Sequence, residues 1–123
     1  MLNVFQQQII DRSQNPLFKG AVDGATHTAE GANLSCGDEL TWQIRVANGI
    51  ITEIRHQTRA CSVCAASADL LAEELQGKPF STCQDWTTDQ VAELLGIPLS
   101  PIRLKCALLP LEALKTAQPS TPK

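Results

Sequence analysis

The sequence of 123 residues contains no tyrosine, and aromatic residues make up only 4% of it. A core therefore has to be built from leucine, isoleucine, valine and alanine, and the length is enough for one small domain. The chain has no run of about 18 apolar residues, which a membrane-spanning helix would need, and it does not begin like a signal peptide. We therefore expect a single domain in the cytoplasm, with no membrane partner.

An excess of positive charge is also missing. The 10 Lys and Arg residues are scattered along the chain and are outnumbered by 13 Asp and Glu residues, which gives a net charge of -3. Proteins that bind nucleic acid usually gather basic residues on one face. We therefore do not expect nucleic acid as a partner.

Cysteine is present in an odd number. The 5 cysteines cannot all pair within one chain, and no disulfide framework is expected without a secretion signal. Such thiols serve as metal ligands or sulfur carriers, or they are small buried apolar residues. Their positions in the fold decide between these roles.

The pattern of apolar residues predicts a mixed fold. A first amphipathic helix covers residues 2–12, and a short edge strand followed by a loop is expected within residues 20–35. Two strands flank Asn48-Gly49 and form a hairpin. In residues 40–46 apolar and polar side chains alternate, so one face of the hairpin is buried.

The register of this hairpin follows from its apolar faces. A two-residue turn would split the apolar face, so we expect a three-residue loop over residues 47–49, with a left-handed Gly49 in a bulge. The expected pairs are Val46 with Ile50, Ile44 with Thr52, and Trp42 with Ile54. This register places Cys36 opposite Ala60, so Cys36 and Cys61 meet at one end of the hairpin.

Three further helices are expected. The first begins after Cys61, ends at Gly77 and turns Cys64 inward, and a short helix follows Thr87. The last helix has a buried stripe that leaves Cys106 on a neighbouring face. This stripe consists of Leu104, Ala107, Leu108, Leu111 and Leu114. Pro110 makes this helix start late or kink locally.

Four side chains in this arrangement have the chemistry of a metal site. Cys36, Cys61 and Cys106 offer three soft thiolate ligands, and Asp38 lies two residues after the first of them. Three cysteines and one aspartate would complete a tetrahedral zinc site or hold an iron-sulfur cluster through one weaker ligand. A weaker ligand suits a site that must release its contents.

Short motifs in consistent order and spacing carry a family resemblance. They are Asn15-Pro16, Gly20, Cys36-Gly37-Asp38, Ala60-Cys61-Ser62, Gly77-Lys78 and Arg103-Leu104-Lys105-Cys106-Ala107. Together they resemble the U-type iron-sulfur cluster assembly scaffolds, a family that includes IscU, SufU and the N-terminal domain of NifU. By this resemblance the scaffold domain covers residues 1–117, and we expect residues 118–123 to form a disordered tail.

The resemblance implies a single-domain α+β fold with a three-stranded antiparallel sheet packed against about four helices. It also implies a scaffold rather than an enzyme. A cysteine desulfurase would pass persulfide sulfur to Cys106, an iron donor would add iron, and a [2Fe-2S] cluster would pass to recipient apo-proteins. The implied ligands are Cys36, Asp38, Cys61 and Cys106, and Asp38 keeps the site labile.

The sequence mixes features of two branches of this family. Lys105 precedes the last cysteine as in SufU-like members, whereas the insertion of those members between the second and third cysteines is missing. A SufU-like protein would be a zinc-containing sulfur acceptor that stimulates its desulfurase, and this alternative stays open. Residues 99–103 replace the chaperone-binding segment of IscU-like members, so a chaperone partner also stays open.

The remaining cysteines and histidines have weaker assignments. Cys64, beside the site, is either a core residue or half of a Cys61–Cys64 pair in a dithiol oxidoreductase. Cys83 is expected to lie in a polar loop and to have no functional role. His27 is not expected to bind metal, and His56 is expected at the surface or edge of the sheet. Lys105 either favours the thiolate of Cys106 or is a solvated cation.

Overall fold

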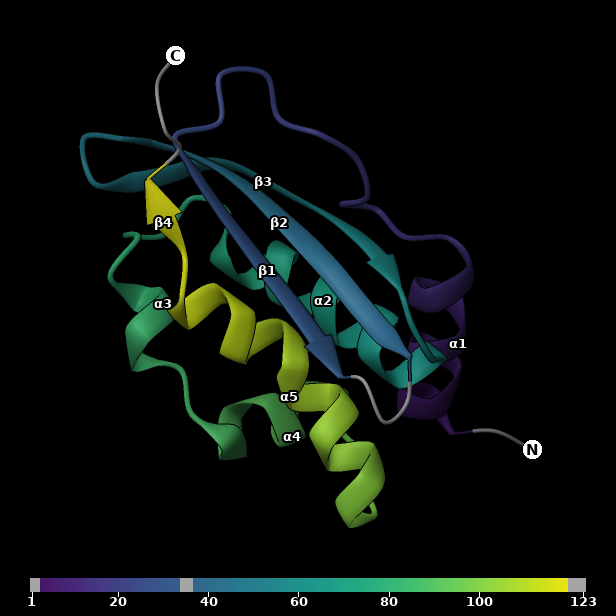
Figure 1. Cartoon of the computed structure of the whole chain (residues 1–123). Coiled ribbons are helices and arrows are strands. Elements are labelled where there is room, and N and C mark those ends of the chain that lie inside the picture. Colours follow the sequence, from purple (N-terminus) through teal and green to yellow (C-terminus); the bar gives the residue numbers. More distant parts are fainter. Residues whose placement is uncertain (1–2, 34–36, 120–123) are drawn as a thin grey trace.

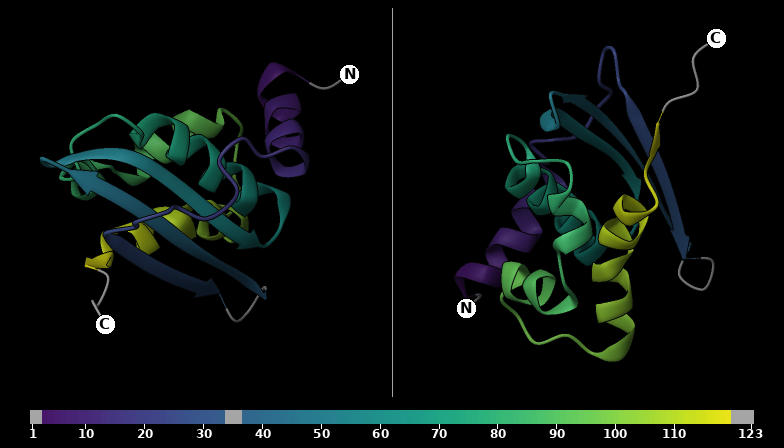
Figure 2. Two further views of the ribbon diagram at one scale, coloured as in Figure 1. Left: turned by 90° about the horizontal axis from the view of Figure 1, so that it is seen from above. Right: turned by 90° about the vertical axis from the view of Figure 1, so that its left-hand side faces the viewer.

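The computed structural model describes residues 3–33 and 37–119, which form five helices and four strands. Figure 1 labels them in chain order as α1 (Val4–Gln14), β1 (His27–Asn33), β2 (Asp38–Ala47), β3 (Ile50–Arg59), α2 (Ser62–Leu75), α3 (Thr82–Asp85), α4 (Thr88–Leu95), α5 (Pro101–Lys115) and β4 (Gln118–Pro119). The helices lie on one side of the sheet (Figure 2). Within the described residues no helix is both long and apolar enough to cross a lipid bilayer.

The sheet confirms the predicted α+β class. Its strand order is β3-β2-β1-β4, and all neighbouring strands are antiparallel. It has one strand more than predicted, because Gln118 and Pro119 pair with Thr28 and His27. The expected disorder of residues 118–123 is therefore wrong for these first two residues, and residues 120–123 lie outside the described part of the chain.

The β2–β3 hairpin has a different register from the predicted one. Asn48 and Gly49 both have positive φ angles, of 54° and 79°, and Ala47 pairs with Ile50 across a two-residue turn. The predicted three-residue loop is therefore wrong. A bulge between Arg45 and Val46 then shifts the strands, so that Ile44 pairs with Ile54 and Trp42 with His56. The apolar faces still agree, but the bulge aligns them instead of the loop.

This register brings the start of β2 to the end of β3. The last pair is Glu39 with Arg59, so Asp38 lies level with Ala60, immediately before Cys61. The prediction that Cys36 lies opposite Ala60 concerns a residue outside the described ranges. The hairpin register therefore brings Asp38 close to the start of α2.

The long helix α5 is fixed to both the sheet and α2. The indole Nε1 of Trp42 donates to the carbonyl of Pro110 at 3.0 Å, and the hydroxyl of Ser67 donates to the carbonyl of Ala107 at 2.7 Å. Strand β1 packs closely against α5 at Gly31, where an added Cβ atom would lie 2.9 Å from the Cβ of Ala113. These contacts fix the part of α5 that follows Cys106, from Ala107 to Ala113.

Helix α5 differs in two ways from its prediction. It begins at Pro101 and contains Pro110, which excludes the late start. Three members of the predicted stripe are buried, whereas Leu104 and Leu108 are only partly buried. Cys106 is itself buried, with 3% of its surface exposed, instead of lying on a neighbouring face.

A buried carboxylate, Asp69 of α2, joins the N-terminal segment to the sheet. It pairs with Arg12 of α1 at 2.9 Å and accepts from His56 Nε2 at 2.9 Å. The backbone N–H groups of Leu17 and Phe18 donate to it at 3.0 and 2.8 Å. His56 lies on β3, an edge strand of the sheet, as one of the two predicted alternatives had it, but at 2% exposure it is buried and not at the surface.

The environment of Asp69 determines how its charge affects stability. Burial raises the pKa of this carboxyl, but the hydrogen bonds from His56, Leu17 and Phe18 and the charge of His56 outweigh burial and hold the pKa below 3.8. The folded state therefore favours the ionised form. The resulting stability is complete above the unfolded pKa and is lost as the pH falls through the folded pKa.

We predict that Asp69→Asn lowers the free energy of unfolding at pH 7 by roughly 2–4 kcal/mol, because Arg12 loses its buried counter-ion and keeps only the more exposed Glu73. The variant should also lose part of the acid sensitivity that the wild type shows below about pH 4. Urea unfolding at several pH values measures both effects. Exposed Glu74→Gln on the same helix is the control, and equal losses in the two variants would contradict the prediction.

Candidate metal centre

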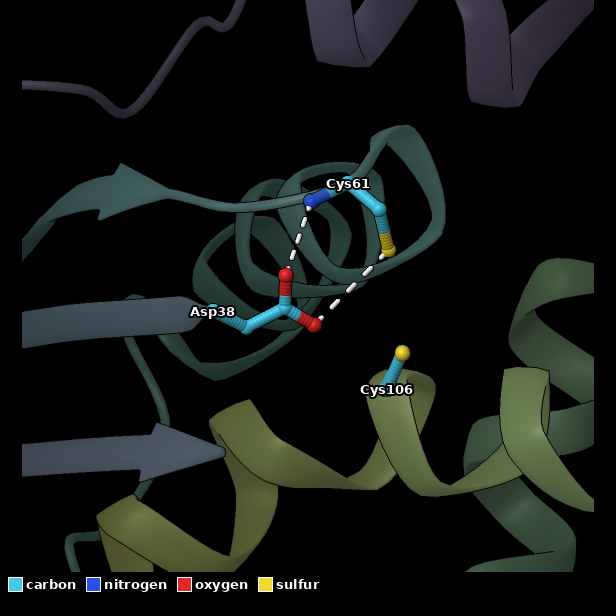
Figure 3. Close-up of side chains that lie close together, drawn as sticks. All are labelled: Asp38, Cys61 and Cys106. Carbon is cyan, nitrogen blue, oxygen red and sulfur yellow. Dashed lines mark hydrogen bonds between the residues drawn. The ribbon is translucent and has the colours of Figure 1, made fainter. Parts of the chain in front are cut away.

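Three side chains converge where β2, α2 and α5 meet. A carboxylate oxygen of Asp38 and the sulfur atoms of Cys61 and Cys106 all lie within 4.8 Å of one another. Figure 3 shows that they come from three different elements and point toward a common space. These are three of the four predicted ligands. The fourth, Cys36, lies outside the described residues.

Asp38 is held in place by the start of α2. Its Oδ1 accepts from the backbone N–H of Cys61 at 3.1 Å, and its Oδ2 lies 3.9 Å from Cys61 Sγ. Cys61 is the N-cap residue of α2, and its own side chain makes no capping hydrogen bond. The carboxylate therefore satisfies one of the N–H groups that a helix start leaves without a partner. It also leaves Oδ2 facing the two sulfur atoms.

Cys106 reaches the site from the second turn of α5. The hydroxyl of Ser100 accepts from the backbone N–H of Arg103 at 3.3 Å, and Pro101 occupies the first turn, so the start of the helix is well defined. The hydrogen bond from Ser67 to Ala107 fixes the next residue. The sulfur atom is therefore positioned by the backbone of two helices that pack together.

The three side chains line a shallow depression of about 880 Å³. Its lining consists of Gly37, Asp38, Thr58, Arg59, Ala60, Cys61, Ile102, Arg103 and Cys106. Cys61 is half-buried, whereas Asp38 and Cys106 are each 3% exposed. Ile102 is 70% exposed, and Arg59 and Arg103 supply positive charge. The lining of the depression therefore combines an exposed apolar side chain with two cationic ones.

The spacing of these donor atoms fits one metal ion. Zinc–sulfur bonds of about 2.3 Å in a tetrahedral site place two sulfur ligands about 3.8 Å apart. The donors, which lie within 4.8 Å of one another, need to approach by no more than about 1 Å to reach this spacing. Thiolate and carboxylate donors suit zinc or iron, so the residues present fit either metal.

The other described cysteines lie in the core. Cys64 is fully buried on α2, which confirms its predicted inward direction. Cys83 is 1% exposed on α3 rather than in a polar loop, and burial raises the pKa of its thiol to about 11. It therefore stays protonated at neutral pH. His27 packs on Phe80 with a ring distance of 4.4 Å and is not part of the group of three.

The sequence predicted Asp38 as a ligand but gave no sign of its hydrogen bond to the start of α2. A usual N-cap side chain belongs to the capped helix itself, where the sequence can reveal it. Here the acceptor comes from a strand that starts 23 residues earlier in the chain. Only the hairpin register connects the two positions.

Known proteins are similar to this chain in sequence. A family model described as the NifU-like N terminal domain matches residues 4–120. Iron sulfur cluster assembly protein 1 of Trachipleistophora hominis is 33% identical, over 94% of this chain and 88% of its own. The iron-sulfur cluster assembly scaffold protein IscU of Thermotoga maritima is 28% identical, over 93% of this chain and 92% of its own.

Solved structures share the fold as well. A crystal structure from Fervidobacterium Islandicum AW-1, described as an iron-sulfur cluster assembly scaffold protein for the SUF system, has a TM-score of 0.75 and 25% identity. The match covers 94% of this chain and 95% of that chain. The N-terminal part of a nitrogen-fixing NifU-like protein from Brucella abortus has a TM-score of 0.70 at 19% identity, which supports the fold alone.

We predict that Asp38→Ala lowers the free energy of unfolding of the metal-free protein by about 1–2 kcal/mol, because the N–H of Cys61 loses its acceptor. Asp38→Asn keeps an acceptor oxygen and should lose less than half of that amount. Urea unfolding measures the difference between the two variants. Glu39→Ala, at the exposed next position, is the control. Equal stability of Asp38→Ala and wild type would contradict the role in holding α2.

Proposed function

Because the chain belongs to the family of NifU-like N-terminal domains, as its motifs indicated, we propose that it is an iron-sulfur cluster assembly scaffold whose site is the Asp38, Cys61 and Cys106 group. Its relatives are named as scaffold proteins, which hold and deliver a cluster and are not enzymes. The observation that most directly supports this proposal is that two thiols and one carboxylate from separate elements lie within 4.8 Å of one another beside a surface depression.

The finer proposal adds a sulfur donor and a fourth ligand. We include Cys36, which precedes Asp38 by two residues in the sequence, as the third thiol. A cysteine desulfurase supplies sulfur as a persulfide. The Cys106 thiolate attacks the outer sulfur of that persulfide, and the donor cysteine leaves as a thiolate. The exposed Ile102 and the neighbouring Arg103 form the rim over which the donor reaches Cys106.

The cluster is the cargo of this site, not a permanent cofactor. An external two-electron reductant, such as a dithiol, converts the persulfide sulfur to sulfide and restores the Cys106 thiol. Iron and sulfide then build a [2Fe-2S] cluster on Cys36, Asp38, Cys61 and Cys106, and recipient apo-proteins take it up. Asp38 binds through a single oxygen, a harder donor than sulfur, so its bond to iron is more easily exchanged. Its second oxygen keeps the hydrogen bond to α2 while the cluster leaves. The thiols need a reducing compartment such as the cytoplasm.

A zinc-containing sulfur acceptor is the second candidate. The compact spacing of the three described donors favours it, because a single tetrahedral ion can bind all of them at once. A two-iron cluster instead needs its ligands divided between two metal ions. Lys105 beside Cys106 is also the residue that the SufU-like branch carries at this position. The two candidates use the same residues and differ in the metal held at rest.

We predict that anaerobic incubation with ferrous iron, a cysteine desulfurase and cysteine produces a visible [2Fe-2S] absorption spectrum. Cys61→Ser and Cys106→Ser should each reduce it by more than about tenfold, because each removes a ligand from the site. Cys83→Ser, at a buried cysteine outside the site, should retain it. An undiminished spectrum in both site variants would contradict the proposal.

Zinc binding separates the two candidates. The sulfur acceptor predicts about one tightly bound zinc ion per chain in freshly purified protein, with release of protons when zinc binds to thiols. Metal analysis and a titration against a zinc chelator measure this. Asp38→Ala and Cys106→Ser should weaken zinc binding by more than about tenfold, as expected for loss of a ligand. Absence of zinc at purification and weak binding on titration would exclude this candidate.

A further inference from the structure

Cys64 forms a closely spaced thiol pair with Cys61 at the start of α2. Cys61 is the N-cap residue, and the N–H of Ala65 donates to its carbonyl at 3.0 Å, so the first turn of the helix is regular. In helical geometry, with a rise of about 1.5 Å per residue, Cα atoms three residues apart are about 5 Å apart. Disulfides form across Cα distances of about 4.4–6.8 Å. The backbone therefore holds the two thiols at a spacing at which a disulfide can form with modest adjustment.

The two thiols differ in access. Cys61 is half-buried and lines the open depression, whereas Cys64 has no exposed surface and lies behind it in the core. A reagent from solution reaches Cys61 first. In redox proteins with a Cys-x-x-Cys helix start, the exposed cysteine is attacked and its partner resolves the mixed sulfur species. The burial of the two thiols matches this division of roles.

We propose that Cys64 is a resolving thiol that releases sulfide from a persulfide carried by Cys61. This rests on the proposed function, because persulfide sulfur must first enter the site. It enters on Cys61 directly, or it passes from Cys106, whose sulfur lies within 4.8 Å of that of Cys61. Cys64 is not needed as a metal ligand, so the assigned role explains a thiol that cluster binding does not use.

The step balances without an added oxidant. The Cys64 thiolate attacks the inner sulfur of the Cys61 persulfide and forms a Cys61–Cys64 disulfide. The electron pair of the broken sulfur–sulfur bond leaves with the outer sulfur, which departs as hydrosulfide and takes up the proton from the Cys64 thiol. Cys61 can bind metal again only after a dithiol reductant has reopened the disulfide.

Cys106 is the competing resolving thiol, because its sulfur also lies near that of Cys61. Trypsin separates the two cases. Cleavage after Arg59 leaves Cys61 and Cys64 in one peptide, which also contains Cys83 because the Lys78-Pro79 bond resists trypsin and the next cleavage follows Arg103. Fragmentation of this peptide shows whether Cys83 is alkylated and therefore outside the disulfide. Cleavage after Lys105 places Cys106 at the start of another peptide. A Cys61–Cys64 disulfide therefore stays within one peptide, whereas a Cys61–Cys106 disulfide joins two.

The test treats the reduced full-length protein with inorganic polysulfide under argon and removes the excess by gel filtration. Released sulfide is measured with time, and free thiols are then alkylated for peptide mapping. In the wild type we expect sulfide release together with a Cys61–Cys64 disulfide. In Cys64→Ala the Cys61 persulfide should persist at least about tenfold longer, because its intramolecular partner is gone. Cys83→Ala, another buried cysteine, should behave as wild type.

The outcomes separate this inference from the proposed function. A Cys61 persulfide that is equally long-lived in wild type and Cys64→Ala overturns the role of Cys64 but leaves sulfur acceptance intact. A Cys61–Cys106 disulfide, or a persulfide found on Cys64 itself, overturns it as well. If no sulfur is taken up on Cys61 or Cys106, sulfur acceptance and this inference both fail. The wild-type peptide map decides the matter even if Cys64→Ala is unstable.

Discussion

The hydrogen bond from the N–H of Cys61 to Asp38 connects strand β2 to the start of helix α2 at the candidate metal site. It joins the first residue of β2 to the first turn of α2, so the same carboxylate that stabilises the helix start also faces the sulfur atoms. The hairpin register determines whether this bond can form, because it brings Asp38 level with Ala60. The position of Asp38 in the candidate metal site therefore depends on the register of the β2–β3 hairpin.

Two other groups of contacts hold the surrounding elements. Asp69 ties α2 to α1, to the backbone of residues 17 and 18, and to His56 of β3. Trp42 and Ser67 hold α5 through two of its carbonyl groups. Both groups are buried, whereas Asp38, Cys61 and Cys106 line a surface depression. Rigid supports and an open site suit a protein that takes up a cluster and passes it on.

The sequence was sufficient to predict the α+β class, the inward direction of Cys64 and the meeting of Asp38, Cys61 and Cys106. It could not reveal the position of the hairpin bulge, because a two-residue turn with a bulge between Arg45 and Val46 buries the same face of β2 as a three-residue loop with the bulge at Gly49. It also missed the buried pairing of His56 with Asp69. Polar residues in a periodic pattern look solvent-exposed unless their partners, which are distant in sequence, are known.

The central claim is tested most directly by identifying the atoms that bind the metal ion. X-ray absorption spectroscopy at the metal edge of the zinc-loaded full chain reports which atoms bind the ion. A ligand set of Cys36, Asp38, Cys61 and Cys106 predicts a shell of three sulfur atoms and one oxygen, with the oxygen contribution altered in Asp38→Ala. A shell dominated by histidine nitrogen, or one unchanged by Asp38→Ala and Cys106→Ser, would contradict it.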